Sequence, residues 1–359
     1  MPADKKFKIV VFALSGIGDA LMFTPALKVL RDNLPSAQID IITMYGGSEE
    51  IVKSTGLADK VIRFDFLNAG AVKSLMFMAS LLGRYTHSIN VYPSNRKEYN
   101  IISFLTGAKH RGAVEYIRAN KSNLGFLNTI TIEESDTRHN VETNIALVKK
   151  MFDIGTAVMP DLIFKPSAGD AEWAENYYRD NISPGDNTLV VGMHPGCSTL
   201  KNHIMRRWEP EKFALLAEQL VKKYKARVLL FGGPEEDELK AQIKGMASST
   251  EIKIVSSPSL SASAALIAKC SFFVTNDSSL MHVASAMKVR TLAIIGPTNT
   301  NYIYPWNTEH IIASLNLECA PCFFYSPKPL SCSREDVQYK CIRELTPGLV
   351  ENKLEKWLR

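Results

Sequence analysis

Short apolar runs alternate with segments of helical periodicity along the first half of the chain. Residues 8–14 form a continuous β-branched and aromatic run, which is typical of a parallel strand buried on both faces. We predict further strands over residues 39–44, 60–64 and 88–91. Apolar residues at helical spacing predict helices over residues 20–33, 48–55 and 71–82. This alternation predicts right-handed crossovers onto an open parallel sheet.

Glycine and proline interrupt the pattern between residues 153 and 186, where only residues 171–179 look helical. The alternation then restarts, with strands predicted over residues 188–193, 227–231, 252–255, 272–275 and 291–295. We therefore predict an α/β protein with two doubly wound, Rossmann-like domains. The expected division is an N-terminal domain (1–165), a linker (166–186), a C-terminal domain (187–345) and a final helix (346–359). Ligands of such sheets bind at the carboxyl ends of the strands, so we expect a cleft between the domains.

Composition agrees with two folded domains. The chain has 359 residues, of which 46% are hydrophobic and 22% charged, and this excludes a disordered or coiled-coil protein. Lys and Arg number 42 against 37 Asp and Glu, a net charge of +5. That excess suits an anionic ligand or acceptor, but without a Lys/Arg run it does not indicate nucleic acid.

The short apolar segments and the cysteines of the chain indicate its cellular compartment. The apolar run at residues 9–14 is shorter than a signal-peptide core, and no stretch approaches the roughly 18 apolar residues of a membrane span. Residues 74–82 (SLMFMASLL) are the longest apolar patch, interpreted as a buried helix, with a membrane-surface helix as the alternative. Six cysteines without a secretory signal favour reduced thiols or metal ligation. We expect a cytoplasmic protein that could contact the inner face of the membrane.

The first candidate motif is a glycine turn between a strand and a helix, formed by Gly16, Gly18 and Asp19. It lets a ligand approach the backbone and the helix N-terminus. A dinucleotide fingerprint would need a third glycine where Leu21 stands, so NAD is disfavoured. Asp19 could act as a general base toward a hydroxyl, and a purely structural helix cap is the alternative.

The second motif follows the predicted strand at residues 272–275. Its helix start offers free N–H groups and hydroxyls for a phosphate, while a carboxylate suits a sugar or ribose hydroxyl. The alternative is a capping Asp/Ser pair with a histidine in the core. The candidate residues are Asp277, Ser278, Ser279 and His282.

Two further turns contribute candidates, and each could equally be an ordinary structural feature of a βα unit. After the strand at residues 188–193, backbone donors come from Gly196, Cys197 and Ser198. The following basic stretch could neutralise a diphosphate through Lys201, Arg206 and Arg207. In the turn at residues 231–236, Glu235 could bind ribose hydroxyls.

Four of the six cysteines have the spacing C-x2-C-x9-C-x8-C, namely Cys319, Cys322, Cys332 and Cys341. A C-x2-C pair can chelate from one turn, and two more thiolates complete a tetrahedral site for a structural zinc or iron. Free thiols and disulfides are the alternatives. Cys197 and Cys270 lie outside this group.

Taken in order, these motifs resemble glycosyltransferase family 9, the lipopolysaccharide heptosyltransferase group. The matching segments are GIGDALMFTPALKVLRDNLP (16–35), HPGCS with RRWEPEKFALLA (194–217), FGGPEE (231–236) and NDSSLMHVASAM with GPT (276–298). The resemblance implies a GT-B fold of two Rossmann-like domains and an ADP-heptose donor held by the C-terminal domain. The cysteine pattern is similar in kind to the iron site of family members that glycosylate proteins.

Family roles carry over residue by residue. The resemblance implies that Asp19 is the catalytic base and that Asp277 and His282 bind the donor. Arg206 stands where the family has a diphosphate-binding lysine, and Lys201 could take that role instead. Ser279 replaces the usual glycine, which narrows the space for the donor.

The expected reaction is an inverting transfer, without a catalytic cofactor, to a hydroxyl of a saccharide, a lipopolysaccharide core or a protein. An anionic or lipid-linked acceptor would lie against the N-terminal domain, although the basic residues there could simply be a solvated face. Two other functions stay open, a nucleotide-sugar 2-epimerase of the same fold and a non-catalytic sugar-nucleotide-binding protein. The acceptor-side candidates are Gly16, Gly18, Lys97, Lys109, Arg111, Arg118, Lys121 and Arg138.

Overall fold

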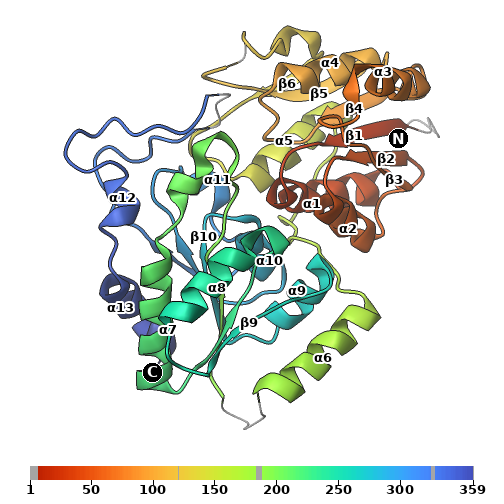
Figure 1. The fold of residues 1–359 in the computed structure, drawn as a ribbon. Coiled ribbons are helices and arrows are strands. Elements are labelled where there is room, and N and C mark those ends of the chain that lie inside the picture. The colour runs from red at the N-terminus through yellow and green to blue at the C-terminus, as the bar shows by residue number, and fades with distance from the viewer. Residues whose placement is uncertain (1–6, 120, 183–187, 325–327, 359) are drawn as a thin grey trace. The chain divides into compact units, whose positions relative to one another are not determined.

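A computed structural model describes residues 7–119, 121–182, 188–324 and 328–358 of the chain (Figure 1). The chain divides into two compact units, the first ending at Lys165 and the second beginning at Pro166. Each unit contains one six-stranded sheet whose paired strands all run parallel. The predicted α/β class with two doubly wound sheets is confirmed.

The N-terminal unit has the strand order β3-β2-β1-β4-β5-β6. Its strands are β1 (Lys8–Ala13), β2 (Gln38–Thr43), β3 (Lys60–Arg63), β4 (His87–Asn90), β5 (His110–Glu115) and β6 (Ile130–Glu133). Its helices are α1 (Ile17–Asn33), α2 (Gly46–Thr55), α3 (Gly70–Leu81), α4 (Lys97–Leu105) and α5 (Asn140–Phe152), with a 3-10 turn at Gly125–Leu127. Strand β1 is central because its apolar residues from Ile9 onward are buried between layers of helices.

The C-terminal unit has the strand order β12-β11-β10-β7-β8-β9. Its strands are β7 (Val190–His194), β8 (Arg227–Leu230), β9 (Ile252–Ile254), β10 (Phe272–Asn276), β11 (Thr291–Ile294) and β12 (His310–Ala313). Its helices are α6 (Ala168–Ile182), α7 (Pro210–Tyr224), α8 (Asp237–Met246), α9 (Leu260–Ile267), α10 (Ser279–Ala286), α11 (Thr300–Ile303), α12 (Lys340–Arg343) and α13 (Pro347–Leu358). Two 3-10 segments occupy Leu200–Arg206 and Pro234–Glu236.

Some elements lie outside the sequence prediction. The edge strands β6 and β12 have four residues each, and most of their side chains are only half-buried, so their apolar pattern is weak. The expected linker (166–186) contains helix α6, which packs against α9. Ser259 at the start of α9 donates to Asp170 in the first turn of α6 at 2.8 Å, which ties α6 to the C-terminal unit.

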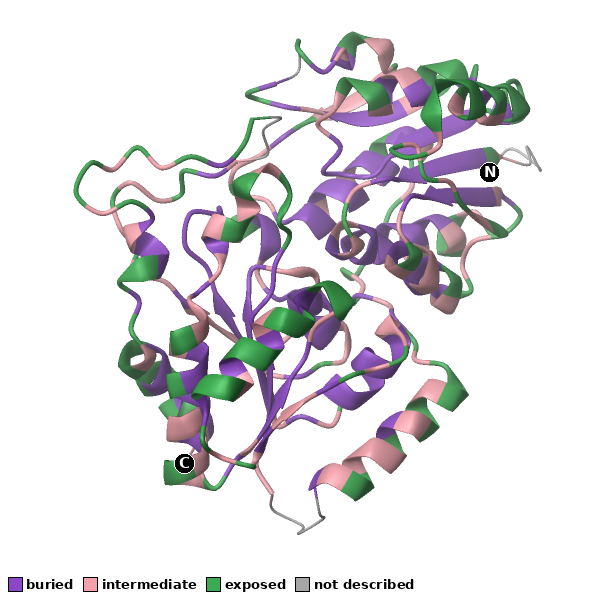
Figure 2. Cartoon of the chain, viewed as in Figure 1, coloured by how far each residue is buried: buried purple, intermediate pink, exposed green. Residues whose placement is uncertain are grey.

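Helix α3 carries the longest apolar patch, and its interpretation as a buried helix is wrong. Only Met78 and Leu81 of this helix are buried, and much of it is drawn as exposed in Figure 2. A single helix over a sheet can turn only one stripe inward, so the remaining apolar side chains face solvent. Within the described residues, no helix is both long and apolar enough to cross a membrane.

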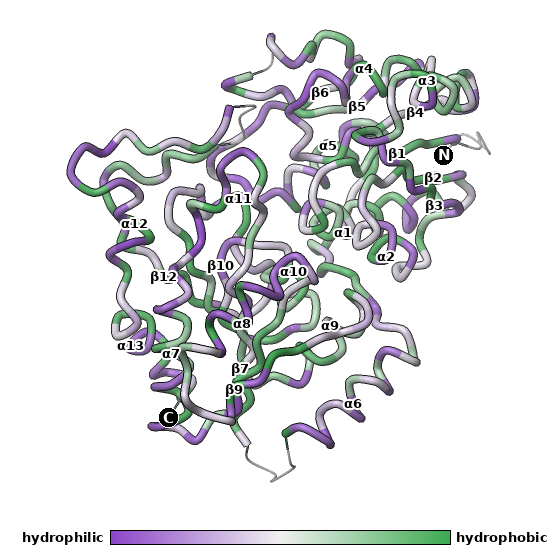
Figure 3. The backbone as a smooth tube through the Cα atoms, viewed as in Figure 1, coloured by the Kyte–Doolittle hydropathy of each residue, from purple (hydrophilic) through white to green (hydrophobic). Residues whose placement is uncertain are grey.

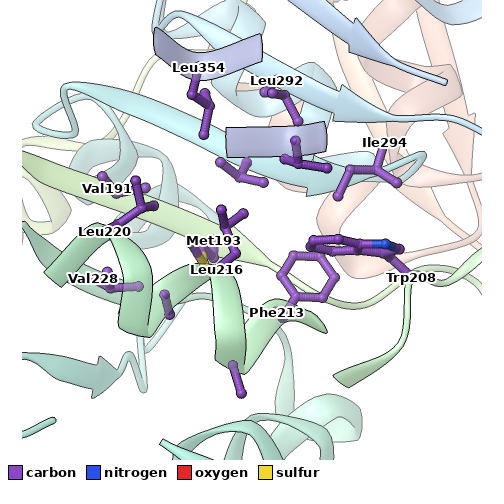
Figure 4. Close-up of a cluster of buried hydrophobic side chains, with 14 of the residues drawn as sticks. Val191, Met193, Trp208, Phe213, Leu216, Leu220, Val228, Leu292, Ile294 and Leu354 are labelled. Atoms are coloured by element: carbon purple, nitrogen blue, oxygen red, sulfur yellow. The ribbon is translucent and has the colours of Figure 1, made fainter. Parts of the chain in front are cut away.

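Trp208 anchors the core of the C-terminal unit (Figure 4). Its ring packs edge-to-face on Phe213, with centroids 5.1 Å apart, and it is 1% exposed. The indole N–H donates to the carbonyl of Leu345 at 2.7 Å, so this buried polar group is satisfied. The Trp208 backbone N–H donates to the Asn276 side chain at 3.0 Å, which fixes the segment before α7 beside the end of β10.

We expect Trp208→Ala to lower the free energy of unfolding of the C-terminal unit by about 3–5 kcal/mol, because it leaves a cavity and an unpaired carbonyl. Leu215→Ala, on the exposed side of α7, is the matched control and should change it by less than about 0.5 kcal/mol. Chemical denaturation followed by circular dichroism measures both. Equal effects of the two substitutions would contradict the central place given to Trp208.

Candidate functional site

Three neighbouring strands of the C-terminal unit bring a histidine, a glutamate and a serine together. His194 ends β7, Glu236 lies in the turn after β8, and Ser278 follows β10, and these strands adjoin in the order β10-β7-β8. His194 Nε2 lies 2.9 Å from a Glu236 carboxylate oxygen, and His194 Nδ1 lies 2.8 Å from the Ser278 hydroxyl. The Ser278 hydroxyl also lies 3.1 Å from that of Thr275. The result is a connected, largely buried polar chain at the carboxyl edge of the sheet.

Glycines make room for the Glu236 carboxyl. A Cβ at Gly196 would collide with this group, and a Cβ at Gly232, where φ is +155°, would lie 2.6 Å from its Oε2. The Gly233 N–H donates to Glu236 at 3.2 Å. Burial alone would raise the pKa of Glu236, but His194, this hydrogen bond and the Arg207 guanidinium together hold that pKa below its usual value. The carboxylate is therefore ionised near neutral pH.

Asp277 forms a buried ion pair with Arg206. Arg206 Nη1 lies 2.5 Å from Asp277 Oδ2, and the Thr298 hydroxyl donates to the same oxygen at 2.7 Å. The guanidinium lies over the Phe323 ring at 5.3 Å. Arg206 Nε has no hydrogen-bond partner among the described residues. The pair balances the Asp277 charge while one guanidinium N–H remains available.

Helix α10 begins at Ser279, with Ser278 at the N-cap position in extended geometry. Serine at this position usually accepts from the first-turn N–H groups. Here the Ser278 side chain makes no capping bond and instead contacts His194. The first-turn N–H groups of α10 thus lack the usual side-chain acceptor.

His282 lies one turn further along α10. It is 4% exposed, and burial lowers its pKa to about 4. Its Nδ1 has no hydrogen-bond partner among the described residues. The imidazole is therefore neutral near pH 7. Its position is compatible both with a structural histidine in the core and with a histidine that binds the donor.

The other predicted residues of this unit differ in exposure. Cys197 is buried, and its thiol, whose pKa burial raises, donates to the carbonyl of His203 at 3.3 Å. Ser198 and Glu235 are exposed, so the buried carboxylate of this turn is Glu236 rather than Glu235. Lys201 is half-buried with φ +52°, and its carbonyl accepts from the Leu330 N–H at 2.9 Å.

In the N-terminal unit, Asp19 lies in the first turn of α1, where the Gly16 N–H donates to its carboxylate at 2.9 Å. Asp19 is therefore the N3 residue of a helix cap whose N-cap residue is Gly16, rather than the N-cap aspartate that the sequence offered as an alternative. The side chain is half-buried, and Gly18 beside it is buried. Capping and proton acceptance are compatible, because a carboxylate has a second oxygen for another donor.

Two of the predicted acceptor-side arginines have local partners. Arg111 donates to the carbonyls of Leu127 at 2.7 Å and Ala108 at 2.6 Å. Arg118 forms a two-pronged ion pair with Asp136 at 3.0 and 2.6 Å. Lys97 is exposed in the first turn of α4. Of these three, Lys97 and Arg118 are exposed, whereas Arg111 is half-buried.

The four-cysteine metal site stays a prediction. All six cysteines are free thiols, so the disulfide alternative is excluded. Burial is the largest cause that raises the pKa of Cys341 to about 11, and the charges of the other three thiols of the group add to it. The four thiols therefore interact electrostatically. No set of three or more His, Cys, Asp or Glu within the described ranges is arranged to hold a metal ion.

The four cysteines differ in burial and in hydrogen bonding. Cys322 is exposed, whereas Cys341 is buried in α12. Cys332 accepts from the Tyr339 N–H at 3.3 Å, and Cys319 accepts from Arg334 at 3.7 Å. Sequence spacing predicts how many thiols a segment offers, and the fold determines how exposed each of them is.

Comparison with known proteins decides the family. Residues 97–330 match the family model of glycosyltransferase family 9 (heptosyltransferase). The chain belongs to glycosyltransferase family 9. The predicted resemblance to this family is thereby confirmed.

Relatives within the family are moderately similar. Lipooligosaccharide heptosyltransferase 2 of Campylobacter jejuni (serotype O:6) is 30% identical over 172 residues, which cover 46% of this chain and 51% of the relative, so the match spans about half of that protein. Lipooligosaccharide heptosyltransferase 2 of Haemophilus ducreyi is 26% identical over 329 residues, covering 86% of this chain and 88% of the relative.

Solved structures confirm the predicted GT-B fold. Escherichia coli ADP-heptose lps heptosyltransferase II superposes with a TM-score of 0.71 at 20% identity, covering 98% of each chain. A family 9 glycosyl transferase from Veillonella parvula gives a TM-score of 0.77 at 20% identity, covering 100% of this chain and 98% of the other. At these identities the similarity concerns the fold.

Sequence reasoning missed several residues of the site. His194 was part of a recognised turn, but nothing in the sequence pairs it with Glu236 or with Ser278. Thr298 lies in the GPT segment, and the sequence alone assigns no role to this threonine. The signal for Glu236 was the cluster of glycines at 196, 232 and 233, since small residues in successive turns indicate that a larger group fills the space.

We expect His282 to make stability depend on pH. Its pKa is about 4 in the folded chain and about 6.5 when unfolded, so protons favour the unfolded state between these values. Stability that is complete above pH 6.5 is lost as pH falls toward 4, by up to about 3 kcal/mol for this group.

Denaturation of wild type and His282→Gln from pH 8 to 4 measures this effect. The difference between the two proteins should be constant above pH 6.5 and should shift in favour of the variant below it. Parallel stability curves over the whole range would contradict a neutral buried His282.

Cys322→Ser should change the free energy of unfolding by less than about 0.5 kcal/mol, because the exposed thiol contributes little packing. Cys341→Ser, which places a hydroxyl in the core, should be clearly destabilising. Thermal unfolding compares the two variants. Equal, large losses in the two variants, together with one metal ion bound per wild-type chain, would show that both thiols are ligands of one metal site.

Proposed function

We propose that the chain is a heptosyltransferase that moves heptose from ADP-heptose to a saccharide hydroxyl of a lipopolysaccharide core. The observation that carries this proposal is the start of α10, where a helix without its side-chain cap lies beside the Arg206–Asp277 pair. The names of relatives support the choice of sugar and acceptor, including an Escherichia coli structure described as an ADP-heptose lps heptosyltransferase. The proposed place of action is the cytoplasmic side of the membrane.

The donor diphosphate would bind at the N-terminus of α10, where free N–H groups favour anions. The Arg206 guanidinium would add a charged donor through Nε, and Lys201 is the alternative cation. A bare carboxylate next to a diphosphate would repel it, but Asp277 is already balanced by Arg206 at 2.5 Å. With Oδ2 occupied by Arg206 and Thr298, Asp277 would present Oδ1 to a sugar hydroxyl.

The remaining donor contacts would come from the turns around the buried carboxylate. Backbone N–H groups of Gly196, Cys197 and Ser198 would face the diphosphate, while Ser279 and His282 would bound the sugar from α10. Exposed Glu235 would contact the ribose, next to Glu236, which holds the turn in place. Glu236 thereby acts through His194 and the backbone, as a positioning residue.

In the proposed reaction Asp19 accepts the proton of the acceptor hydroxyl. The acceptor oxygen forms a bond to the anomeric carbon as the bond from that carbon to the diphosphate oxygen breaks. Transfer inverts the anomeric centre, and ADP leaves with the electron pair of the broken bond. Negative charge that develops on the diphosphate is stabilised by preorganised N–H groups, an effect typically worth on the order of 10² to 10³ in rate per donor. No catalytic cofactor takes part in this scheme, and Gly16, Gly18 and Lys97 would border the acceptor.

Asp19→Asn tests the base. It should lower the transfer rate by about 10² to 10⁴, because an amide cannot accept the proton, while its oxygen can still accept from the Gly16 N–H. Asp32→Asn, on the exposed face of the same helix, is the matched control and should keep the wild-type rate. Product formation from ADP-heptose and a core acceptor measures both.

Thermal stabilisation by ADP separates binding from chemistry in the same variants. A ligand present at 100 times its Kd adds about 2.7 kcal/mol, and Asp19→Asn should retain this gain. GDP, UDP and dTDP serve as comparison nucleotides. Near-wild-type transfer by Asp19→Asn would remove Asp19 from the mechanism, and donor binding without transfer in the wild type would favour a binding protein.

A further inference from the structure

One segment of the N-terminal unit carries an excess of charge equal to that of the whole protein. Between residues 66 and 114 there are six Lys and Arg residues and a single carboxylate, Glu98, a net charge of +5. The whole chain also has a net charge of +5, so the rest of the sequence is neutral overall. The six cations are Lys73, Arg84, Arg96, Lys97, Lys109 and Arg111.

The same segment exposes apolar side chains. Within the described ranges, seven of the sixteen exposed large apolar residues fall in these 49 positions, far more than an even distribution along the chain would give. Val72, Leu75 and Met76 on α3 are 73%, 64% and 68% exposed. The other four are Leu67, Leu82, Phe104 and Leu105. Figure 2 colours the α3 region by burial, and Figure 3 colours the same region by hydropathy.

Helix α3 has two apolar stripes. Phe77, Met78 and Leu81 pack into the core of the N-terminal unit. Val72, Leu75 and Met76 have the spacing i, i+3, i+4, which places them on the opposite side of the helix. A helix that is apolar on both sides is normally covered on both sides. The core covers the first stripe of α3, and the second stripe is exposed in the isolated chain.

The exposed stripe continues onto the end of α4. Helices α3 and α4 contact each other, and the Gly83 N–H donates to the carbonyl of Thr106 at 2.9 Å. The Leu82 side chain lies against Gly107, where a Cβ would be 3.1 Å from Leu82 Cδ1. Phe104 and Leu105 immediately precede this junction. We call the seven exposed apolar residues, together with Lys73, Arg84 and Lys109, the α3–α4 face.

The positive charge of the α3–α4 face indicates what kind of partner could cover it. The three cations of the α3–α4 face are exposed, and the nearest carboxylate along α3 is Asp65, before the helix begins. Apolar side chains flanked by Lys and Arg suit an anionic bilayer surface, where apolar groups enter the headgroup boundary and cations meet phosphates. Lys73, between apolar neighbours on α3, can extend its ammonium to the headgroups.

We propose that the α3–α4 face docks on the surface of a bilayer containing anionic phospholipid, with Val72, Leu75 and Met76 inserted at the interface. The reason for such docking rests on the proposed function, since a lipid-linked acceptor lies in the same bilayer. Binding itself requires neither donor nor acceptor. The two proposals can therefore fail separately.

Vesicle flotation of the full chain tests the docking. Wild-type protein should float with vesicles of phosphatidylcholine containing phosphatidylglycerol and should not float with phosphatidylcholine alone. Binding should weaken as salt rises, because charges farther apart than about 8 Å are screened at physiological ionic strength. Wild-type protein that ignores anionic vesicles would overturn the proposal.

The decisive variant is Leu75→Glu with Met76→Glu, which replaces two inserted side chains by charges repelled from the surface. It should reduce vesicle binding by about tenfold or more. Leu215→Glu on α7, at a leucine that is 56% exposed, is the matched control and should bind as wild type does. Lys73→Glu with Arg84→Glu should abolish the preference for phosphatidylglycerol.

Circular dichroism and thermal stabilisation by ADP show whether each variant is folded. Equal binding by the folded double variant and the control would overturn the proposal. Size-exclusion chromatography under the same conditions tests whether a second copy of the chain covers this face instead. If the wild type is a dimer, the double variant is a monomer and neither binds vesicles, the docking proposal is overturned. If the wild-type chain binds vesicles but is not stabilised by ADP, the result supports membrane docking by the α3–α4 face and counts against ADP-heptose as the donor.

Discussion

The buried carboxylate of Glu236 is the constraint on which the arrangement of the C-terminal site depends. It lies between the ends of β7 and β8, and His194 connects it to Ser278 after β10. Removing an ionised carboxylate from water is costly unless it is paired and hydrogen-bonded. Here the turn residues meet that requirement, and glycines at 196 and 232 leave space for the group. The path of two loops thus follows from one side chain.

Charge balance is the second theme of the site. Glu236 and Asp277 bring two carboxylates to the same sheet edge, and each has a cationic or hydrogen-bonding partner within it. This balance makes an anionic ligand compatible with an acidic turn. Neutral His282, with a pKa of about 4, adds no charge of its own near neutral pH. In the proposed function, this site would bind an anion chiefly through oriented N–H groups and one guanidinium.

Sequence alone predicted the fold and the family because both depend on local patterns. Buried parallel strands such as β1 are continuous apolar runs, and the glycine turns follow them directly. Partnerships across the sheet were not predictable, since the His194–Glu236 contact joins residues 42 positions apart. Cysteine spacing did not reveal that Cys341 is buried while Cys322 is exposed. The apolar pattern of α3 identified a helix, but hydrophobicity does not reveal which stripe lacks a neighbour.

The N-cap of α10 has a consequence for the dynamics of the chain. Ser278 directs its hydroxyl to His194, so in the proposed function an anion that accepts from the first N–H groups would complete the helix start. Amide hydrogens in this turn should therefore exchange with solvent faster than those in the buried strand β10 just before it. In this sense the nucleotide would be the missing cap of the helix, and ligand occupancy could be followed residue by residue through hydrogen exchange.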